Sequence, residues 1–242
     1  MFSRTENVQT FVRAYPLVTL FIVIQLLVFV IDSLVPDLRI VALGGSFHLA
    51  LAQGEWYRLL TANFIHLGLG HLLFNSFALI IFGPAMERMV GHIKFAVFYL
   101  VAGVVANLLT FFTVSELFYL QAGASGAILA ILGFYVYIGR FRRTLIYSQD
   151  ARLVYIFVAI SAVFTLIGAN VSLWGHVYGF LAGFLLAIPL SRFAVPYSRP
   201  LRYGKYKPRK YSPPIIHTGE GKWIFYVIVG LAVFGLFARF LR

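Results

Sequence analysis

Long apolar stretches, separated by shorter polar segments, make up most of the chain. A helix needs about 20 apolar residues to cross the hydrocarbon layer of a bilayer, and helices can do so because they pair their own backbone groups. The pattern therefore predicts an all-α polytopic membrane protein. The expected spans lie at 17–35, 67–86, 95–114, 124–139, 153–171, 173–191 and 223–241.

The spacing of these stretches predicts the domain organisation. We expect a short N-terminal segment at 1–16, followed by a core of six helices at 17–191. Residues 192–222 are rich in proline and carry eight basic residues, which is typical of an extended linker. A seventh transmembrane helix at 223–242 then ends the sequence.

One connection within the core is unusually apolar. Residues 36–66 include Trp56 and Tyr57 among many aliphatic side chains, and this composition does not suit a loop surrounded by water. We expect this outer loop to lie in the membrane interface and to be partly helical.

The distribution of basic residues predicts the orientation. If the spans alternate in direction, 16 of the 20 Lys and Arg residues fall on the side of the N-terminus. Cytoplasmic loops are enriched in Lys and Arg, so we expect a cytoplasmic N-terminus. The compact chain shows no targeting extension, which suits a multi-pass protein of a bacterial plasma membrane.

Composition narrows the possible partners. The chain is 61% hydrophobic and 12% charged, with a formal net charge of +12. In so apolar a chain, basic charge fits cytoplasmic loops beside anionic membrane lipids. Nucleic acid binding would need a folded reading element, which the sequence does not suggest. The absence of cysteine excludes disulfides and thiol catalysis.

Several polar residues fall inside the predicted spans, where they are costly and usually functional. His71 and Asn75 are four residues apart and share one helix face, while Ser125 opens the fourth span and His176 the sixth. Each group lies 15 or 16 residues from a charge at the cytoplasmic end of its span. That spacing predicts that the four side chains lie in one layer of the membrane. The layer is roughly 22–24 Å above the cytoplasmic boundary and about 6–8 Å below the outer surface.

The chemistry of this layer favours acyl transfer. A serine hydroxyl needs an adjacent base to become a nucleophile, and His176 can be that base for Ser125 near neutral pH. The Ser125 N–H, the Asn75 amide and the His71 ring could form an oxyanion hole. No carboxylate shares this depth, so the sequence predicts a Ser–His dyad rather than a triad.

Glycines are expected to bring the two helices together. Gly126 in the fourth span, and Gly179 and Gly183 in the sixth, supply small surfaces that allow close backbone approach, as does Gly123 before the fourth span. Such an approach is needed to place the Ser125 hydroxyl within about 3 Å of an imidazole nitrogen.

The chain resembles the rhomboid family of intramembrane serine proteases over about residues 55–190. Three motifs that carry the resemblance occur in the family's order. They are His66-x4-His71-x3-Asn75, Gly123-Ala124-Ser125-Gly126 and His176-x2-Gly179-x3-Gly183. A Gly-x3-Glu-x3-Gly element around Glu87 and the Tyr57-Arg58 pair in the outer loop add to the likeness.

This resemblance implies a rhomboid-like six-helix core that cleaves single-span membrane proteins near the extracytoplasmic face. It implies Ser125 as nucleophile and His176 as base, with His71 and Asn75 in the oxyanion hole. The seventh span resembles an extra C-terminal helix that some members carry.

The same resemblance implies that Arg58, His66 and Glu87 are structural and hold the outer loop. Two positions depart from the family pattern. Leu129 stands where an aromatic residue often packs beneath the base, and Gly175 stands where alanine is frequent. These changes affect the tuning of the base rather than its role.

Other interpretations remain open at this point. Ser125 could be a packing residue, and His71 and Asn75 an interhelical pair, in an inactive rhomboid-like protein that binds transmembrane helices. A transporter would favour internal repeats and carboxylates within spans, and the sequence shows neither.

A metal site is not expected. His66 and His71 are five residues apart and do not form the spacing of a zinc-binding helix, so the sequence predicts neither a metal nor another cofactor. The expected partners are transmembrane protein substrates and membrane lipids. Nothing in the pattern indicates an oligomeric state.

Overall fold

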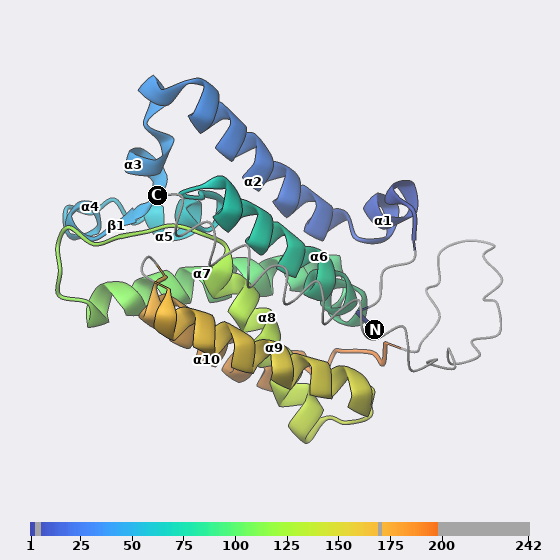
Figure 1. Cartoon of the computed structure of the whole chain (residues 1–242). Coiled ribbons are helices and arrows are strands. Elements are labelled where there is room, and N and C mark those ends of the chain that lie inside the picture. The colour runs from blue at the N-terminus through green and yellow to red at the C-terminus, as the bar shows by residue number, and fades with distance from the viewer. Residues whose placement is uncertain (3–5, 169–170, 198–242) are drawn as a thin grey trace. The chain divides into compact units, whose positions relative to one another are not determined.

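Helices account for almost all of the regular structure (Figure 1). The computed structural model describes residues 1–2, 6–168 and 171–197. Within them the predicted all-α fold is confirmed. The expected seventh helix at 223–242, and the linker beyond residue 197, lie outside the described residues.

The six predicted core spans each correspond to a helix. Five are long and apolar enough to cross a membrane: α2 (Pro16–Leu34), α6 (Leu69–Val90), α7 (His92–Thr113), α9 (Ser148–Ile167) and α10 (Leu173–Leu190). The sixth, α8 (Ser125–Phe141), is a shorter apolar helix. A short helix that was not predicted, α1 (Val8–Ala14), precedes them.

Two of these helices extend beyond their apolar stretches. α9 begins at Ser148, where Asp150 lies in the first turn and its negative charge complements the helix dipole. α6 continues through Glu87 to Val90. Glu87 interrupts the apolar pattern of the sequence, but its side chain is buried in the fold. Hydropathy alone misses such turns, since polar groups with partners are compatible with a helix.

The outer loop folds into short elements, so the prediction of a partly helical segment is confirmed. They are η1 (Pro36–Leu38), α3 (Ile40–Gly44), β1 (Ser46–Phe47), α4 (His48–Ala52), α5 (Arg58–Thr61) and η2 (Ala62–Phe64). β1 pairs antiparallel with β2 (Leu120–Gln121), with Ser46 opposite Gln121. This pairing ties the outer loop to the segment that leads into α8.

Arg58 holds the first half of the outer loop together. Its guanidinium donates to Glu55 at 2.8 Å, to the carbonyl of Ala42 at 2.6 Å and to that of Gly45 at 3.1 Å. The structural role that the resemblance implied for Arg58 agrees with these contacts.

Glu87 occupies a different place from the one expected. The resemblance implied support of the outer loop, but the carboxylate accepts hydrogen bonds of 3.0 Å from the backbone N–H groups of Leu17 and Val18. It also lies 2.6 Å from His92 Nδ1. Glu87 therefore caps the N-terminus of α2, at the end of α6 away from the outer loop, where a carboxylate stabilises the helix dipole.

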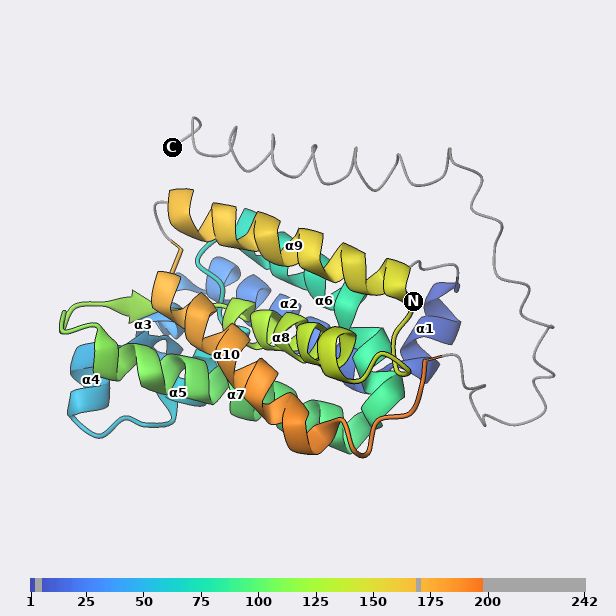
Figure 2. The same cartoon turned by 90° about the horizontal axis from the view of Figure 1, so that it is seen from below.

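α8 is the central helix of the bundle. It packs against α6, α7, α9 and α10, and the two cartoon views show it between them (Figures 1 and 2). With 17 residues it spans about 26 Å, which is less than the hydrocarbon thickness of about 30 Å. A central helix can be this short because its neighbours, rather than lipid, surround it.

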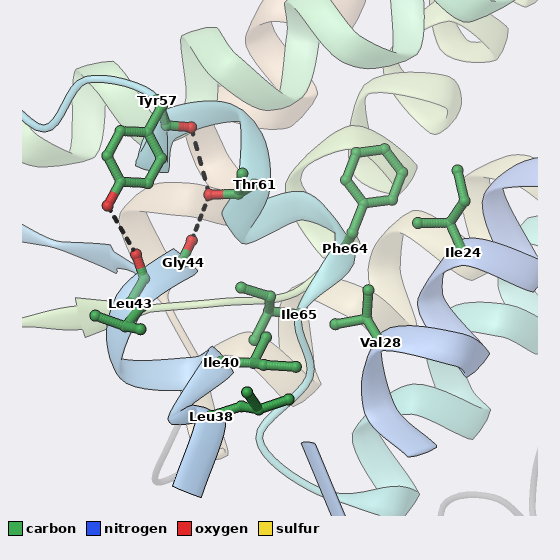
Figure 3. A pocket seen from close by; sticks show the side chains of 10 residues that line it. All are labelled: Ile24, Val28, Leu38, Ile40, Leu43, Gly44, Tyr57, Thr61, Phe64 and Ile65. Carbon is green, nitrogen blue, oxygen red and sulfur yellow. Dashed lines mark hydrogen bonds between the residues drawn. The ribbon is translucent and has the colours of Figure 1, made fainter. Parts of the chain in front are cut away.

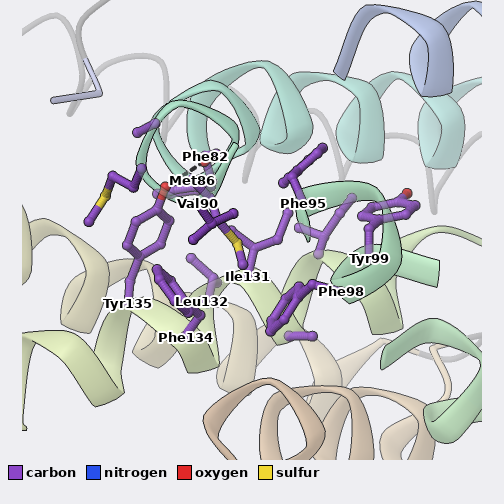
Figure 4. Packing of buried hydrophobic residues seen from close by; sticks show 14 of the residues in the cluster. Phe82, Met86, Val90, Phe95, Phe98, Tyr99, Ile131, Leu132, Phe134 and Tyr135 are labelled. Atoms are coloured by element: carbon purple, nitrogen blue, oxygen red, sulfur yellow. Dashed lines mark hydrogen bonds between the residues drawn. The ribbon is translucent and has the colours of Figure 1, made fainter. Parts of the chain in front are cut away.

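The main apolar core lies between α6, α7 and α8 (Figure 4). It joins Phe82 and Met86 of α6, Phe95 of α7, and Ile131 and Tyr135 of α8, all nearly inaccessible. The Tyr135 hydroxyl donates to the carbonyl of Phe82 at 2.7 Å, so this buried polar group is paired. The core fixes the positions of these three helices relative to one another.

An apolar cavity of about 430 Å³ separates α2 from the outer loop (Figure 3). Ile24 and Val28 of α2 line one side, and Ile40 and Ile65 line the other. The cavity lining includes none of the serine, histidine or asparagine residues singled out from the sequence. The candidate site lies elsewhere.

Candidate active site at the crossing of α8 and α10

α8 and α10 meet through their backbones. A methyl group added to Gly179 would overlap with the backbone of Gly126, and one added to Gly183 would overlap with that of Ala130. Gly133 of α8 is likewise covered by the backbone of Phe180. Only glycine at these positions allows the helices to approach so closely, so the crossing depends directly on the sequence.

Ser125 and His176 lie beside this crossing. Ser125 is the first residue of α8 and precedes Gly126, while His176 lies between Gly175 and Gly179 on α10. A methyl group on Gly126 would lie 3.4 Å from the Gly175 carbonyl oxygen, in addition to the contact with Gly179. The two residues are therefore on contacting turns, at the end of the bundle that faces the outer loop.

The turn before Ser125 is covered by His71 and Asn75. Gly123 has a φ of +129°, a conformation that favours glycine, and its N–H donates to the carbonyl of Ala62 at 2.9 Å. A methyl group there would lie 2.7 Å from His71 Nε2 and 3.7 Å from Asn75 Nδ2. Both side chains thus lie against the backbone that leads into α8.

Asn75 presents an amide donor at this turn. The residue is buried, and its Nδ2 has no hydrogen-bond partner among the described residues. An unpaired buried amide costs free energy, roughly 1–3 kcal/mol, and such groups in native structures call for a functional explanation. The structure thus keeps a hydrogen-bond donor available beside Gly123.

His66 lies before α6 rather than within it, and packs against His71. The two imidazole rings form an edge-to-face pair with centroids 5.0 Å apart. Burial lowers the pKa of His66 to about 3, so its ring is neutral at physiological pH. The contact with His71 gives His66 a supporting position next to the site.

His176 has a hydrogen-bond partner that the sequence did not suggest. Its Nδ1 lies 2.6 Å from the hydroxyl oxygen of Thr165, a buried residue of α9. Two helices, α9 and α10, therefore meet at this ring.

A polar network fixes the strand before α8 to the start of α10. Gln121 donates to Asn107 Oδ1 at 2.7 Å and accepts from the Ser172 hydroxyl at 3.1 Å. Asn107 in turn donates to the carbonyl of Leu59 at 2.8 Å, and Ser172 caps α10 by accepting from Gly175 N–H. These amides do not stand out in the sequence, because nothing in their spacing shows that they meet.

Within residues 1–2, 6–168 and 171–197, no group of three or more His, Cys, Asp or Glu side chains is arranged to hold a metal ion.

Together, the fold and this site define a polytopic helical membrane protein with a serine and a histidine on contacting turns inside the bundle. The Rhomboid domain profile matches residues 53–193, which covers more than half of the chain. The chain belongs to the rhomboid family.

Individual relatives agree with this assignment. The chain is 37% identical over 190 residues to Putative rhomboid protease YdcA of Bacillus subtilis, covering 77% of this chain and 94% of the relative. It is 33% identical over 193 residues to Rhomboid protease GluP of the same organism, covering 78% of this chain but only 38% of GluP. RHOMBOID-like protein 4 of Arabidopsis thaliana is 34% identical over 160 residues, or 64% of this chain and 39% of the relative.

Proposed function

We propose that the protein is an intramembrane serine endopeptidase. It cleaves transmembrane segments of single-span membrane proteins near the extracytoplasmic face, with Ser125 and His176 as a catalytic dyad. The observation that carries this proposal is the backbone contact between α8 and α10, which sets these two residues on touching turns. Family membership and two relatives named as rhomboid proteases support it.

The reaction follows from the chemistry of the two side chains. His176 takes the proton of the Ser125 hydroxyl as its oxygen attacks the scissile carbonyl carbon. The tetrahedral intermediate then collapses as the same imidazole donates that proton to the leaving amine, giving an acyl-enzyme and a new N-terminus. A water molecule, activated by His176, hydrolyses the ester and restores the serine.

The oxyanion of the intermediate needs donors that are already in place. The N–H of Ser125 lies in the first turn of α8 and has no acceptor within its own helix. Asn75 Nδ2, which is unpaired and close to Gly123, supplies a second donor, and the ring of His71 supplies a third. Preorganised donors of this kind contribute about 2.7–4 kcal/mol each to transition-state stabilisation.

The depth of the site agrees with cleavage inside the membrane. α8 is shorter than the hydrocarbon layer. If its C-terminal end lies at the cytoplasmic boundary, Ser125 at its N-terminal end lies below the outer surface of the membrane. Basic residues at that boundary, including Arg140 and Arg142, support a cytoplasmic N-terminus for the chain. A substrate helix must unwind at the cut, so weak helix formers are expected there.

The test compares Ser125→Ala and His176→Ala with wild type in detergent and in proteoliposomes. We expect a fluorophosphonate probe to label wild type, to fail on Ser125→Ala and to react much more slowly with His176→Ala. Cleavage of a panel of single-span substrates should follow the same order. Ser33→Ala, an exposed serine of α2, is the matched control and should behave as wild type.

A folded wild type that binds transmembrane segments, but is neither labelled nor able to cleave them, would contradict the proposal. That result would favour an inactive rhomboid-like binding protein.

A further inference from the structure

The hydroxyl of Thr165 makes two short contacts that together determine its role. It donates its only hydrogen to the carbonyl of Ser161, one turn earlier in α9, at 2.6 Å. Its oxygen also lies 2.6 Å from Nδ1 of His176. Because the hydroxyl hydrogen is already used, Thr165 can only accept a hydrogen bond from His176.

The direction of this hydrogen bond determines which nitrogen of the His176 imidazole carries the proton. Nδ1 must carry the hydrogen that Thr165 accepts, and a neutral imidazole carries only one. The Nε2 lone pair is therefore free. We propose that Thr165 is a positioning residue that fixes His176 in the tautomer whose Nε2 can take the proton of Ser125. This inference rests on the proposed function of the site.

The location of Thr165 supports a specific role. The buried residues of α9 are Asp150, Ala151 and Val154 near its start, and Thr165 near its end. Residues on either side of Thr165 are more exposed, and Leu166 is 73% exposed. Thr165 is thus the buried residue of the outer half of α9, as far as the structure describes that helix, and its hydroxyl meets the ring of His176.

A hydroxyl suits this position better than a carboxylate would. A carboxylate buried among apolar helices would require a large desolvation cost unless it were paired. The threonine oxygen is a neutral acceptor, so it orients the ring without adding a charge. When His176 becomes an imidazolium during the reaction, the same hydrogen bond becomes charge-assisted and stronger.

The experiment replaces Thr165 in the full chain with valine, which has the same shape but no acceptor, and with serine, which keeps the hydroxyl. We expect Thr165→Val to lower kcat about 10- to 100-fold with KM within about twofold of wild type, as for other residues that orient a functional histidine. Thr165→Ser should recover most of kcat. Ser161→Ala, which keeps the backbone carbonyl one turn away, is the control and should match wild type.

A spectroscopic measurement tests the tautomer without relying on turnover. With 15N-labelled histidine, assigned through a His176→Gln sample, the wild-type ring should show a protonated Nδ1 and an unprotonated Nε2. Thr165→Val should show a mixture of tautomers.

Two results would overturn the inference: a wild-type-like tautomer with unchanged kcat in Thr165→Val, or Thr165→Ser as impaired as Thr165→Val. If wild type shows the Nδ1–H tautomer but neither cleaves substrates nor reacts with the fluorophosphonate, the proposed protease function fails and the positioning of His176 by Thr165 stands.

Discussion

Gly179 lies directly against the carbonyl group of Gly126, with no space for a side chain between them. This backbone contact brings the turns of Ser125 and His176 together, and the hydrogen bond between Gln121 and Ser172 adds to it. Substitutions at the crossing should therefore affect activity even though glycine takes no part in the chemistry.

Gly179→Val should reduce proteolysis by at least about 100-fold, because the isopropyl group must push α10 away from α8. Overpacking of this kind also destabilises a helix bundle by about 1–3 kcal/mol. Cleavage rate and thermal unfolding in detergent measure the two effects. Gly70→Val is the matched control, since nothing lies within 4 Å of an added methyl group there. Normal cleavage by Gly179→Val would show that the close contact is not required.

Asn75→Ala should lower kcat about 100- to 1,000-fold, because it removes a donor of the proposed oxyanion hole. Stability should change little, since the lost Nδ2 has no partner among the described residues. Asn63→Ala provides the contrast: its buried amide donates to the carbonyls of Leu59 and Leu60, and its loss should cost about 1–3 kcal/mol of stability. An Asn75→Ala variant that is unstable but fully active per folded molecule would refute the assignment.

Glu87→Gln should destabilise the bundle by about 1–2 kcal/mol while leaving the activity of the folded protein intact. The charged carboxylate accepts from two N–H groups at the start of α2, and the neutral amide of the variant would keep only one acceptor oxygen. Thermal unfolding, with activity normalised to folded protein, separates the two effects. Glu116→Gln, at an exposed carboxylate, should change neither quantity. A loss of activity without a loss of stability would point to a direct role for Glu87.

The pH dependence of stability should carry the signature of His66. Burial lowers its pKa in the folded protein to about 3, whereas an unfolded histidine titrates near 6.5. Below about pH 6.5 the unfolded state binds a proton that the folded state does not, so stability falls with decreasing pH, by up to about 1.4 kcal/mol per unit. Above that pH the contribution is constant.

His66→Gln should show a flatter decline in unfolding temperature between about pH 6.5 and pH 4 than wild type. Equal slopes for the two proteins would mean that His66 does not carry this dependence.

The apolar pattern was sufficient for the six core helices, because each is built around a long apolar stretch. It was insufficient at their ends. Ser148 to Arg152 are mostly polar yet helical, and Glu87 is charged yet buried, because each position depends on partners that hydropathy does not describe.

The residues of the candidate site were likewise predicted from the sequence only in part. Ser125 and His176 stood out because their residue types and neighbouring glycines are unusual inside a membrane span. Thr165 did not, since threonine is common in such helices and its partner comes from another one. Gln121 and Asn107 were missed for the same reason, as was the two-residue pairing of β1 with β2.

α8 and α10 touch without intervening side chains. If the bilayer thickens, thins or tilts the bundle, we expect the backbones of these two helices to shift together. Adaptation to an incoming polypeptide must then come from elements with little buried surface, of which α9 is one. Through Thr165, any such displacement of α9 would be transmitted to the base itself.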